Sequence, residues 1–474
     1  MMRRMSISRR AVSLLAVVLL LVAGGLAALY LTSSHREVTT SSAAAYDAYR
    51  EGVENDRRFY KKEAQVAFAR ALSLDPNFAM AMLRLAGLSN HDQALALIER
   101  ARRLRGRLTE RERLLVDLAT TAEKGSREER LRIARAIHQK WPNDIDAAMF
   151  LCGNEMAQGH AEKALQIYSE LLAQDPNNAA VYNQLGYYYA WRGDYDKAIE
   201  NLKKYQFMAS DQANPYDSLG EVQAYSGRYE EAIVNLNRAL ALKPDFFEST
   251  FHLGVVYEGQ GNYAKAIDSY ERASREALTD GRRMELLGAA LRAAIVARDR
   301  AGARDAAGRV ADLPKGKNTE IWRTYADVAV DLVEDRTGDA ERRLTELKPK
   351  LVAMYEKETK EGQRRSHFPG WNALMALVKT RQGKTEEAIA LYELNANPPN
   401  PWDNFEGRRW VYEGRAHLAE LLARKGDLDR AEKLLAENQK WNPSWAPTRS
   451  AELAVVQLRR ERVLSASGAP AAPR

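Results

Sequence analysis

The chain has 474 residues, of which 45% are hydrophobic and 28% are charged, and its formal net charge is +7. Apolar residues at this level can form a large core, which excludes a wholly disordered protein. The single cysteine, Cys152, excludes an intrachain disulfide framework and a cysteine-based zinc site.

Positive charge is concentrated at the N-terminus. Four arginines in residues 1–10 leave a charge of +3 for the rest of the chain, and residues 145–280 hold 20 acidic and 11 basic side chains, a net charge of −9. A surface that binds nucleic acid needs a concentrated basic face. The basic run at residues 100–113 is interleaved with Glu110 and Glu112, which favours a solvated helix face. We therefore expect no nucleic-acid partner.

Residues 11–31 form an apolar run, AVSLLAVVLLLVAGGLAALYL, without a charged residue. As a helix the run would reach about 32 Å, enough to cross a hydrocarbon core of about 30 Å. The arginines of residues 1–10 place that end in the cytoplasm by the positive-inside rule. The sequence therefore predicts a single-pass anchor in the inner (cell) membrane. Everything after residue 31 would then be extracytoplasmic, in the periplasm of a bacterium that has one.

A cleaved signal peptide is the alternative for this segment. Gly24 and Gly25 could shorten the apolar run, and Gly25-Leu26-Ala27 offers small residues at the spacing that cleavage needs. The run continues past that point, which favours a retained anchor. Residues 32–45, rich in Ser, Thr and Ala, are expected to form a flexible linker, and residues 465–474 a disordered tail.

Self-similarity at a spacing of 34 residues dominates the middle of the chain. Four glycines, four alanines and four leucines share this spacing: Gly159, Gly193, Gly227 and Gly261; Ala164, Ala198, Ala232 and Ala266; and Leu151, Leu185, Leu219 and Leu253. Two successive units read VYNQLGYYYAWRGDYDKAIENLKKY (181–205) and PYDSLGEVQAYSGRYEEAIVNLNRA (215–239). This pattern resembles the tetratricopeptide repeat (TPR) family, whose unit is a 34-residue helix–turn–helix.

The resemblance implies an all-α fold, a superhelical TPR solenoid preceded by one N-terminal transmembrane helix. The array is expected to cover residues 46–464, with its best repeats at 145–280 and 372–443. Residues 79–141 and 281–360 are helical but off-register, with hairpin turns expected at Gly302 and Gly338. The proline-rich insert 395–410 should be a loop, and a polar-faced helix near 447–463 should cap the array.

The small residues of the repeat have a packing role in this family. Leu185-Gly186 should lie midway along a first helix, where the missing side chain lets the second helix approach, with Ala198 facing the pair. Cys152 occupies the same position as Gly186, so we expect a small buried residue rather than a reactive thiol.

Catalytic and cofactor motifs are weak. Gly259-Gln260-Gly261 and Gly383-Lys384-Thr385 imitate parts of nucleotide-binding loops but fall at expected repeat turns. The seven histidines show no metal-ligand spacing, and the chain has no Gly-x-Ser-x-Gly motif. We therefore expect no enzyme activity, no cofactor and no metal. An exported enzyme with an unrecognised site is a minor alternative.

First-helix positions line the inner groove of the TPR family. The positions that usually contact ligands there correspond to Asn183, Tyr187, Trp191, Asp217, Glu221, Tyr225, Phe251 and Glu258. An aromatic and acidic groove would suit an extended peptide with apolar anchors and neighbouring Lys or Arg. The alternative is that these aromatic side chains only pack between neighbouring repeats.

The function that follows is an anchored, extracytoplasmic scaffold or adaptor that binds protein partners in its groove. A second hypothesis is a sensory or regulatory arm of a signalling or envelope-biogenesis complex. Residues 101–119, followed by repeats, resemble the TPR arrays attached to some bacterial Ser/Thr kinases, although the chain has no kinase signature.

Overall fold

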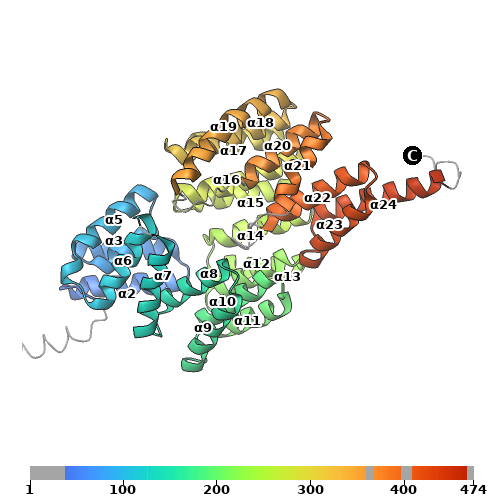
Figure 1. Cartoon of the computed structure of the whole chain (residues 1–474). Helices are drawn as coiled ribbons and strands as arrows, with labels where there is room; N and C mark the ends of the chain where they lie inside the picture. Colours follow the sequence, from blue (N-terminus) through green and yellow to red (C-terminus); the bar gives the residue numbers. More distant parts are fainter. Residues whose placement is uncertain (1–37, 125, 359–367, 397–407, 467–474) are drawn as a thin grey trace, which may run out of the picture. The chain divides into compact units, whose positions relative to one another are not determined.

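The computed structural model describes residues 38–124, 126–358, 368–396 and 408–466. In these ranges the regular structure is 23 α-helices and one short 3-10 helix, without a strand (Figure 1). The expected cytoplasmic segment 1–10 and the expected anchor 11–31 lie outside the described residues. Within the described part of the chain, no helix is both long and apolar enough to cross a membrane.

The described chain divides into two compact units. The first comprises residues 38–53, 64–87 and 91–133, and the second residues 54–63, 88–90 and most of the chain from residue 134 onward. The first unit contains most of α2 (Ala43–Arg57) and α3 (Lys61–Leu74), and all of α4 (Ala79–Ala86), α5 (His91–Arg103), η1 (Arg105–Arg107) and α6 (Glu110–Lys124). Helix α7 (Arg127–Lys140) runs from the first unit into the second.

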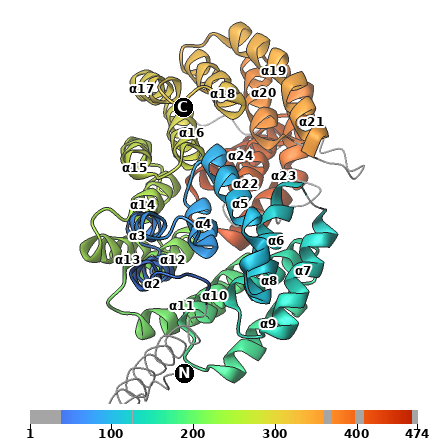
Figure 2. The same ribbon diagram turned by 90° about the vertical axis from the view of Figure 1, so that its left-hand side faces the viewer.

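The second unit is a succession of helical hairpins. Its helices are α8 (Ile145–Ala157), α9 (Ala161–Gln174), α10 (Ala179–Arg192), α11 (Tyr195–Met208), α12 (Ala213–Tyr225), α13 (Tyr229–Leu242), α14 (Phe247–Gly259), α15 (Tyr263–Glu276), α16 (Asp280–Ala297), α17 (Arg300–Ala311), α18 (Lys317–Val333), α19 (Thr337–Glu358), α20 (Pro369–Arg381), α21 (Thr385–Ala396), α22 (Arg408–Arg424), α23 (Leu428–Trp441) and α24 (Ala446–Ala466). The first helix of a hairpin packs against its own second helix and against the next first helix, as α12 does with α13 and α14. Helices α15, α17, α19 and α21 lie outside their partners in Figure 2, so the first helices line the inner side of this unit.

Hairpin turns share one backbone conformation. Nine described turn residues have a positive φ: Phe59, Gly159, Gly193, Gly227, Gly261, Arg298, Asp335, Gly383 and Gly426. Five residues after each of them stands a fully buried alanine: Ala64, Ala164, Ala198, Ala232, Ala266, Ala303, Ala340, Ala388 and Ala431. The positive-φ turn residue and the buried alanine five positions later therefore occur together at each of these turns. Glycine is the commonest turn residue but is not required there.

The hairpin turns expected at Gly302 and Gly338 were wrong. Both glycines lie inside the first turn of a second helix, α17 or α19, and the turns are made by Arg298 and Asp335. From Gly261 to Asp335 the turns recur every 37 residues instead of every 34. The reason is that α16 and α18 have 18 and 17 residues, where α12 and α14 have 13. An addition of about one helical turn preserves the packing face.

The glycines midway along the first helices are sites of close helix contact. A Cβ at Gly220 would lie 2.7 Å from Cγ of Leu236, and the corresponding glycines approach the residue sixteen positions further on in the same way. The nearest partner is therefore this larger residue, not the alanine expected to face the glycine. Cys152 occupies the same slot, is fully buried, and donates from Sγ to the carbonyl oxygen of Ala164 at 3.7 Å. Burial raises the pKa of the Cys152 thiol to about 12, in keeping with a small core residue.

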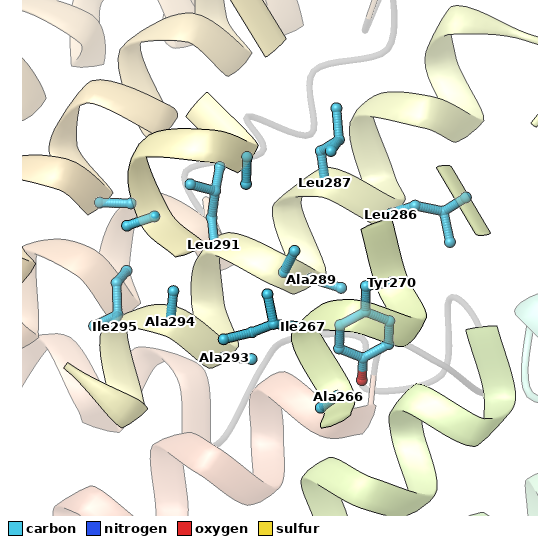
Figure 3. Packing of buried hydrophobic residues seen from close by; sticks show 14 of the residues in the cluster. Ala266, Ile267, Tyr270, Leu286, Leu287, Ala289, Leu291, Ala293, Ala294 and Ile295 are labelled. Atoms are coloured by element: carbon cyan, nitrogen blue, oxygen red, sulfur yellow. The ribbon is translucent and has the colours of Figure 1, made fainter. Parts of the chain in front are cut away.

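The core of the long repeats is formed by aliphatic side chains that interlock between hairpins. Figure 3 shows Ala266, Ile267 and Tyr270 of α15 beside Leu286 and other side chains of α16. Tyr270 and Leu286 are completely buried in one apolar cluster that extends from α12 to α20. Burial of a leucine side chain of this kind contributes roughly 2 kcal/mol. This cluster fixes α16 relative to both neighbouring hairpins.

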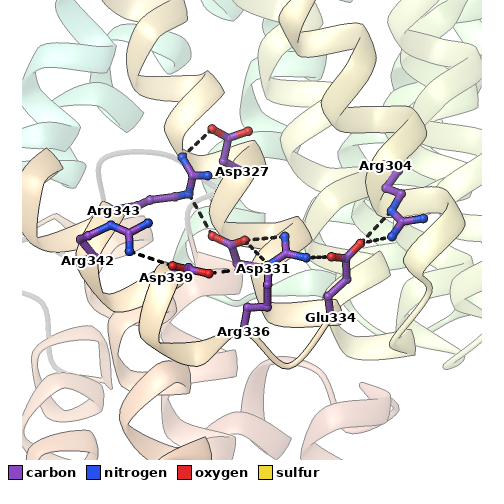
Figure 4. Close-up of polar contacts among 8 residues, drawn as sticks. All are labelled: Arg304, Asp327, Asp331, Glu334, Arg336, Asp339, Arg342 and Arg343. Carbon is purple, nitrogen blue, oxygen red and sulfur yellow. Dashed lines mark hydrogen bonds and ion pairs between the residues drawn. The ribbon is translucent and has the colours of Figure 1, made fainter.

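A network of ion pairs supports the α18–α19 hairpin. Asp331, almost fully buried, accepts from Nε of Arg336 at 2.9 Å and from Nε of Arg343 at 2.9 Å (Figure 4). Glu334 pairs with Arg336 and accepts from Nε of Arg304, on the preceding hairpin, at 2.7 Å. These contacts hold the turn at which Asp335 adopts its positive φ.

The last helix differs from the expected polar cap. Helix α24 does close the array, but Leu453, Val456 and Val463 expose most of their surface. The prolines of the insert fall in residues 397–407, outside the described part of the chain, whereas the ends of the insert belong to α21 and α22.

Candidate functional site

A cavity of about 530 Å³ lies on the inner side of the second unit. Most of its wall comes from the first helices α14, α16, α18, α20 and α22 and from the start of α24, with Tyr263 of α15 and Tyr392 of α21 added. Most of the lining is apolar, and a small number of charged side chains is interspersed. A concave, mainly apolar cavity of this size with few polar groups is typical of ligand sites in proteins.

Helix α16 contributes more of the wall than any other helix, because its added turn extends along the cavity. Its lining residues run from Arg282 to Val296. Gly288 lets the indole of Trp322 pack against the α16 backbone, since a Cβ there would lie 2.4 Å from Cζ3 of Trp322. Trp322 contacts Tyr325 edge to face at a centroid distance of 6.1 Å, which gives α18 an aromatic wall.

Four carboxylates and two guanidinium groups lie along the cavity. Arg292 lies between Glu258, at 3.7 Å, and Glu413, at 3.5 Å. Arg282 pairs with Glu285 at 2.9 Å and lies over the Phe251 ring, 4.9 Å from its centroid. Both guanidinium groups therefore already have carboxylate partners within the wall.

The remaining carboxylate of the cavity is Glu420. It is half-buried on α22, one helical turn from His417, and no ion pair or hydrogen bond joins it to another described residue. Burial lowers the pKa of His417, so its imidazole is neutral at pH 7 despite the opposing effect of Glu420. The lining thus carries an excess of two negative charges, one of them at Glu420.

The loop between α23 and α24 closes the array beside the cavity. Trp441, Asn442 and the start of α24 lie on the hairpin turns at Gly193, Gly227 and Gly261. Asn442 accepts from Oη of Tyr229 and donates to the carbonyl oxygen of Ala224, each at 3.4 Å. The hairpins from α10 to α24 therefore form a closed circuit, and the cavity is inside it.

The groove residues predicted from the sequence divide into two groups. Phe251 and Glu258 line the cavity. The other six lie elsewhere: Asn183, Tyr187, Trp191, Asp217, Glu221 and Tyr225. Asn183 and Tyr225 are almost fully buried, and Trp191 packs partly buried against the core of α8 to α10.

Three of these residues belong to a polar network between α10, α12 and α14. The Tyr187 hydroxyl donates to Glu221 at 2.6 Å, and Asp217 accepts from Oγ of Ser249 at 2.7 Å and lies 3.0 Å from Nδ1 of His252. Asp217 and Glu221 are 3% and 6% exposed. A lysine at either position would enter a buried network, so charge reversal there tests folding as well as binding. Their contact with a peptide stays a prediction.

The sequence reasoning missed the residues of the long repeats that form most of the cavity, including Arg292, Trp322 and Glu420. A signal was present, because Ala266, Ala303 and Ala340 recur at a spacing of 37 and mark the hairpins. Within the described ranges, no group of three or more His, Cys, Asp or Glu side chains is arranged to hold a metal ion.

Family models match the region where the hairpins repeat most regularly. A model described as TPR repeat matches residues 220–261, and two described as tetratricopeptide repeat match residues 131–186 and 155–219 and residues 249–284. Residues 131–284 of the chain are tetratricopeptide repeats. TPR arrays generally mediate protein–protein interaction. No curated protein matches the chain.

Several solved TPR-type structures are similar to this chain. The crystal structure of MamA is 22% identical and covers 40% of this chain and 95% of its own, with a TM-score of 0.26. The crystal structure of the APC/C hetero-tetramer Cut9–Hcn1 is 14% identical, covers 87% and 76%, and has a TM-score of 0.46. A tetratricopeptide repeat protein from Parabacteroides merdae is 12% identical, covers 64% and 97%, and has a TM-score of 0.35. At these values the similarities say nothing about function.

Proposed function

We propose that this TPR protein is a membrane-anchored, extracytoplasmic scaffold that binds a protein partner on the inner side of its C-terminal repeats. The cavity between α14 and α24 is the observation that carries the proposal. Its apolar and aromatic lining offers an anchor site for a side chain of an extended segment of the partner. Its charged groups would fix the orientation in which that segment binds. We propose binding and not catalysis, because most charged lining groups are already paired with one another.

Contact with the partner can be tested by crosslinking at two matched valines. Val296 lies at the cavity and is 49% exposed, whereas Val234, on α13 and away from the cavity, is 69% exposed. A photo-crosslinking residue at Val296 of the full chain should capture a defined partner in native membranes, and the same residue at Val234 should not. Equal capture at the two positions, or capture at Val234 alone, would contradict binding at the cavity.

A second variant tests whether the interior of the cavity matters. Ala373→Trp places an indole in the cavity, and Val234→Trp adds the same side chain to an exposed position elsewhere. We expect Ala373→Trp to abolish capture from Val296 and Val234→Trp to leave it unchanged. Circular dichroism of both variants shows whether the helices remain intact.

The membrane anchor is supported by the apolar run 11–31 and the arginines before it. A reporter enzyme that is active only outside the cytoplasm, fused after Thr40, should be active and should sediment with membranes. Recovery of an inactive fusion in the soluble fraction would contradict both the anchor and the extracytoplasmic location. An active fusion released from the membrane would indicate the cleaved signal peptide instead.

A further inference from the structure

We propose that the cavity selects a positively charged group, a lysine or arginine side chain of the bound segment, and that Glu420 is the carboxylate that pairs with it. This inference rests on the proposed function, because it specifies which partner segment the cavity accepts. Its central residues, Trp322 on α18 and Glu420 on α22, lie outside the region that the family models match, which ends at residue 284.

The charge balance of the wall is the first argument. Glu258 and Glu413 share Arg292, and Glu285 pairs with Arg282, so each guanidinium is neutralised where it lies. Glu420 has no such partner among the described residues, and its neighbour His417 has a pKa lowered by burial. A half-buried carboxylate without a cation loses hydration that nothing replaces. A ligand cation would supply the missing interaction.

The aromatic wall is the second argument. Trp322, Tyr325, Tyr263 and Phe251 all line the cavity. A cation close to an aromatic face is attracted by the negative potential of the ring. Arg282 already makes this contact with Phe251 at 4.9 Å, which shows that the cavity wall favours it. The hydrocarbon stem of a lysine or arginine would also pack against the apolar residues of α16 and α20.

An acidic ligand fits the same wall poorly. An acidic group that approached Arg292 would also approach Glu258 and Glu413, which lie 3.7 and 3.5 Å from the guanidinium, and both carboxylates would repel it. A neutral apolar ligand would leave Glu420 without a partner and reduce its contact with water further. The arrangement therefore discriminates by repulsion as well as by attraction.

The test uses the full chain in detergent micelles and a random twelve-residue peptide library displayed on phage. Selected peptides are kept only if they bind wild-type protein and fail to bind Ala373→Trp, so each depends on the cavity. We expect these peptides to carry a lysine or arginine next to an apolar residue. Enrichment of neutral or acidic cavity-dependent peptides would overturn the inference and leave the scaffold proposal standing. The absence of any cavity-dependent peptide would overturn both.

A double-mutant cycle then assigns the pairing to Glu420. Replacing the selected basic residue by methionine, or making Glu420→Gln in the protein, should each weaken binding at least tenfold in fluorescence anisotropy. The two changes together should weaken it no further than one alone. Glu230→Gln, an exposed carboxylate on α13, is the control and should have no effect. Additive losses would show that the cation pairs with another group and would overturn the role of Glu420.

The expected loss of peptide affinity in Glu420→Gln should not come from a loss of folding stability. Removing a half-buried charge that has no described partner should leave the melting temperature of Glu420→Gln equal to or above that of the wild type. The methionine peptide should also bind Glu420→Gln and wild type equally. A methionine peptide that loses affinity for Glu420→Gln would show a general distortion of the cavity and overturn the assignment.

Discussion

The indole of Trp441 lies against the backbone of Gly193, so that a Cβ on Gly193 would be 2.3 Å from Cζ3 of the indole. Trp441 ends α23, and Gly193 is the turn residue between α10 and α11. The contact therefore joins the end of the array to one of its early hairpins. Gly193 has two reasons to be glycine, its φ of +82° and the indole that covers it.

These two reasons can be separated with a matched pair. Gly159 has nearly the same φ, +80°, but no atom lies within 4 Å of its Cβ position. Gly159→Ala should destabilise by about 1 kcal/mol, from the left-handed conformation alone. Gly193→Ala should cost about 3 kcal/mol, because the clash with the indole adds to the strain. Urea unfolding measures both values.

A second variant identifies the source of the difference. Adding Trp441→Ala to Gly193→Ala removes the clash, so Gly193→Ala should then cost no more than Gly159→Ala does. Hydrogen exchange should show residues 441–446 loosened in Gly193→Ala and unchanged in Gly159→Ala. Equal costs for the two single variants would contradict the contact between Trp441 and Gly193.

The mid-helix glycines offer another matched comparison. Gly220 has Leu236 2.7 Å from its Cβ position, whereas Gly153, exposed on α8, has no atom within 4 Å. Gly220→Leu should destabilise by about 1–3 kcal/mol through overpacking. Gly153→Ala should stabilise by about 0.5–1 kcal/mol, because alanine restricts the unfolded chain. Thermal unfolding checks both signs, and a stable Gly220→Leu would contradict the close approach.

At Arg298 we expect a change to glycine to stabilise the protein, whereas a change from glycine at the other turns should destabilise it. Its φ is +54°, its side chain is exposed, and the turn it makes corresponds to glycine turns in other repeats. Arg298→Gly should stabilise the protein by roughly 1 kcal/mol, because only the strained conformation is relieved. Arg298→Ala keeps that strain and should give no comparable gain. Chemical denaturation of the two variants distinguishes relief of strain from loss of the arginine side chain.

The pH dependence of stability should report on Glu248. Burial, with a smaller effect of the nearby Asp217 charge, raises the pKa of Glu248 to about 7 from an ordinary value of 4.5. The folded state therefore holds the proton more tightly than the unfolded state. The stabilisation that comes from this tighter proton binding by Glu248 is fully present below pH 4.5. It is lost between pH 4.5 and 7, which lowers the free energy of unfolding by at most about 3 kcal/mol.

Glu248→Gln removes this titration. The variant should match the wild type near pH 4 and be the more stable of the two above pH 7, by up to about 3 kcal/mol. Glu230→Gln, at an exposed carboxylate, should follow the wild-type profile. Denaturation at a series of pH values gives the curves, and parallel curves for Glu248→Gln and wild type would contradict the raised pKa.

The sequence predicted the helical repeats where glycine marks the turns and failed where it does not. Residues 145–280 keep the 34-residue spacing, and their hairpins fall where the spacing places them. Beyond Gly261, Arg298 and Asp335 make the turns, so a search for glycine led to Gly302 and Gly338 inside helices. Next to the turn at Asp335, Glu334 accepts from Arg304 of the preceding hairpin, a contact between residues 30 positions apart that local sequence does not reveal.

The candidate site was less predictable than the fold. Contacts between the last helices and the early hairpins decide which part of the inner surface stays accessible to a ligand. Asp217 and Glu221 occupy first-helix positions, as expected, but both carboxylates contact His252 of the next repeat. Phe251 and Glu258 line the cavity together with residues of α16 and α22, the first helices one and four hairpins further along the chain. The pairing of Arg292 with Glu413 joins residues 121 positions apart, and no repeat period predicts it.

The contact of residues 441–446 with the turns at Gly193, Gly227 and Gly261 has a consequence for synthesis of the protein. An open array can fold hairpin by hairpin as it leaves the ribosome, because each repeat needs only its neighbour. Here the turns of the early hairpins are covered only by a segment that is synthesised 185 to 248 residues later, counted from Gly261 to Ala446 and from Gly193 to Trp441. Their turns remain uncovered throughout that interval, and contacts of such long sequence separation slow the final step. Nascent chains that stop before Trp441 should therefore expose this surface to chaperones, and chains that extend past Ala446 should not.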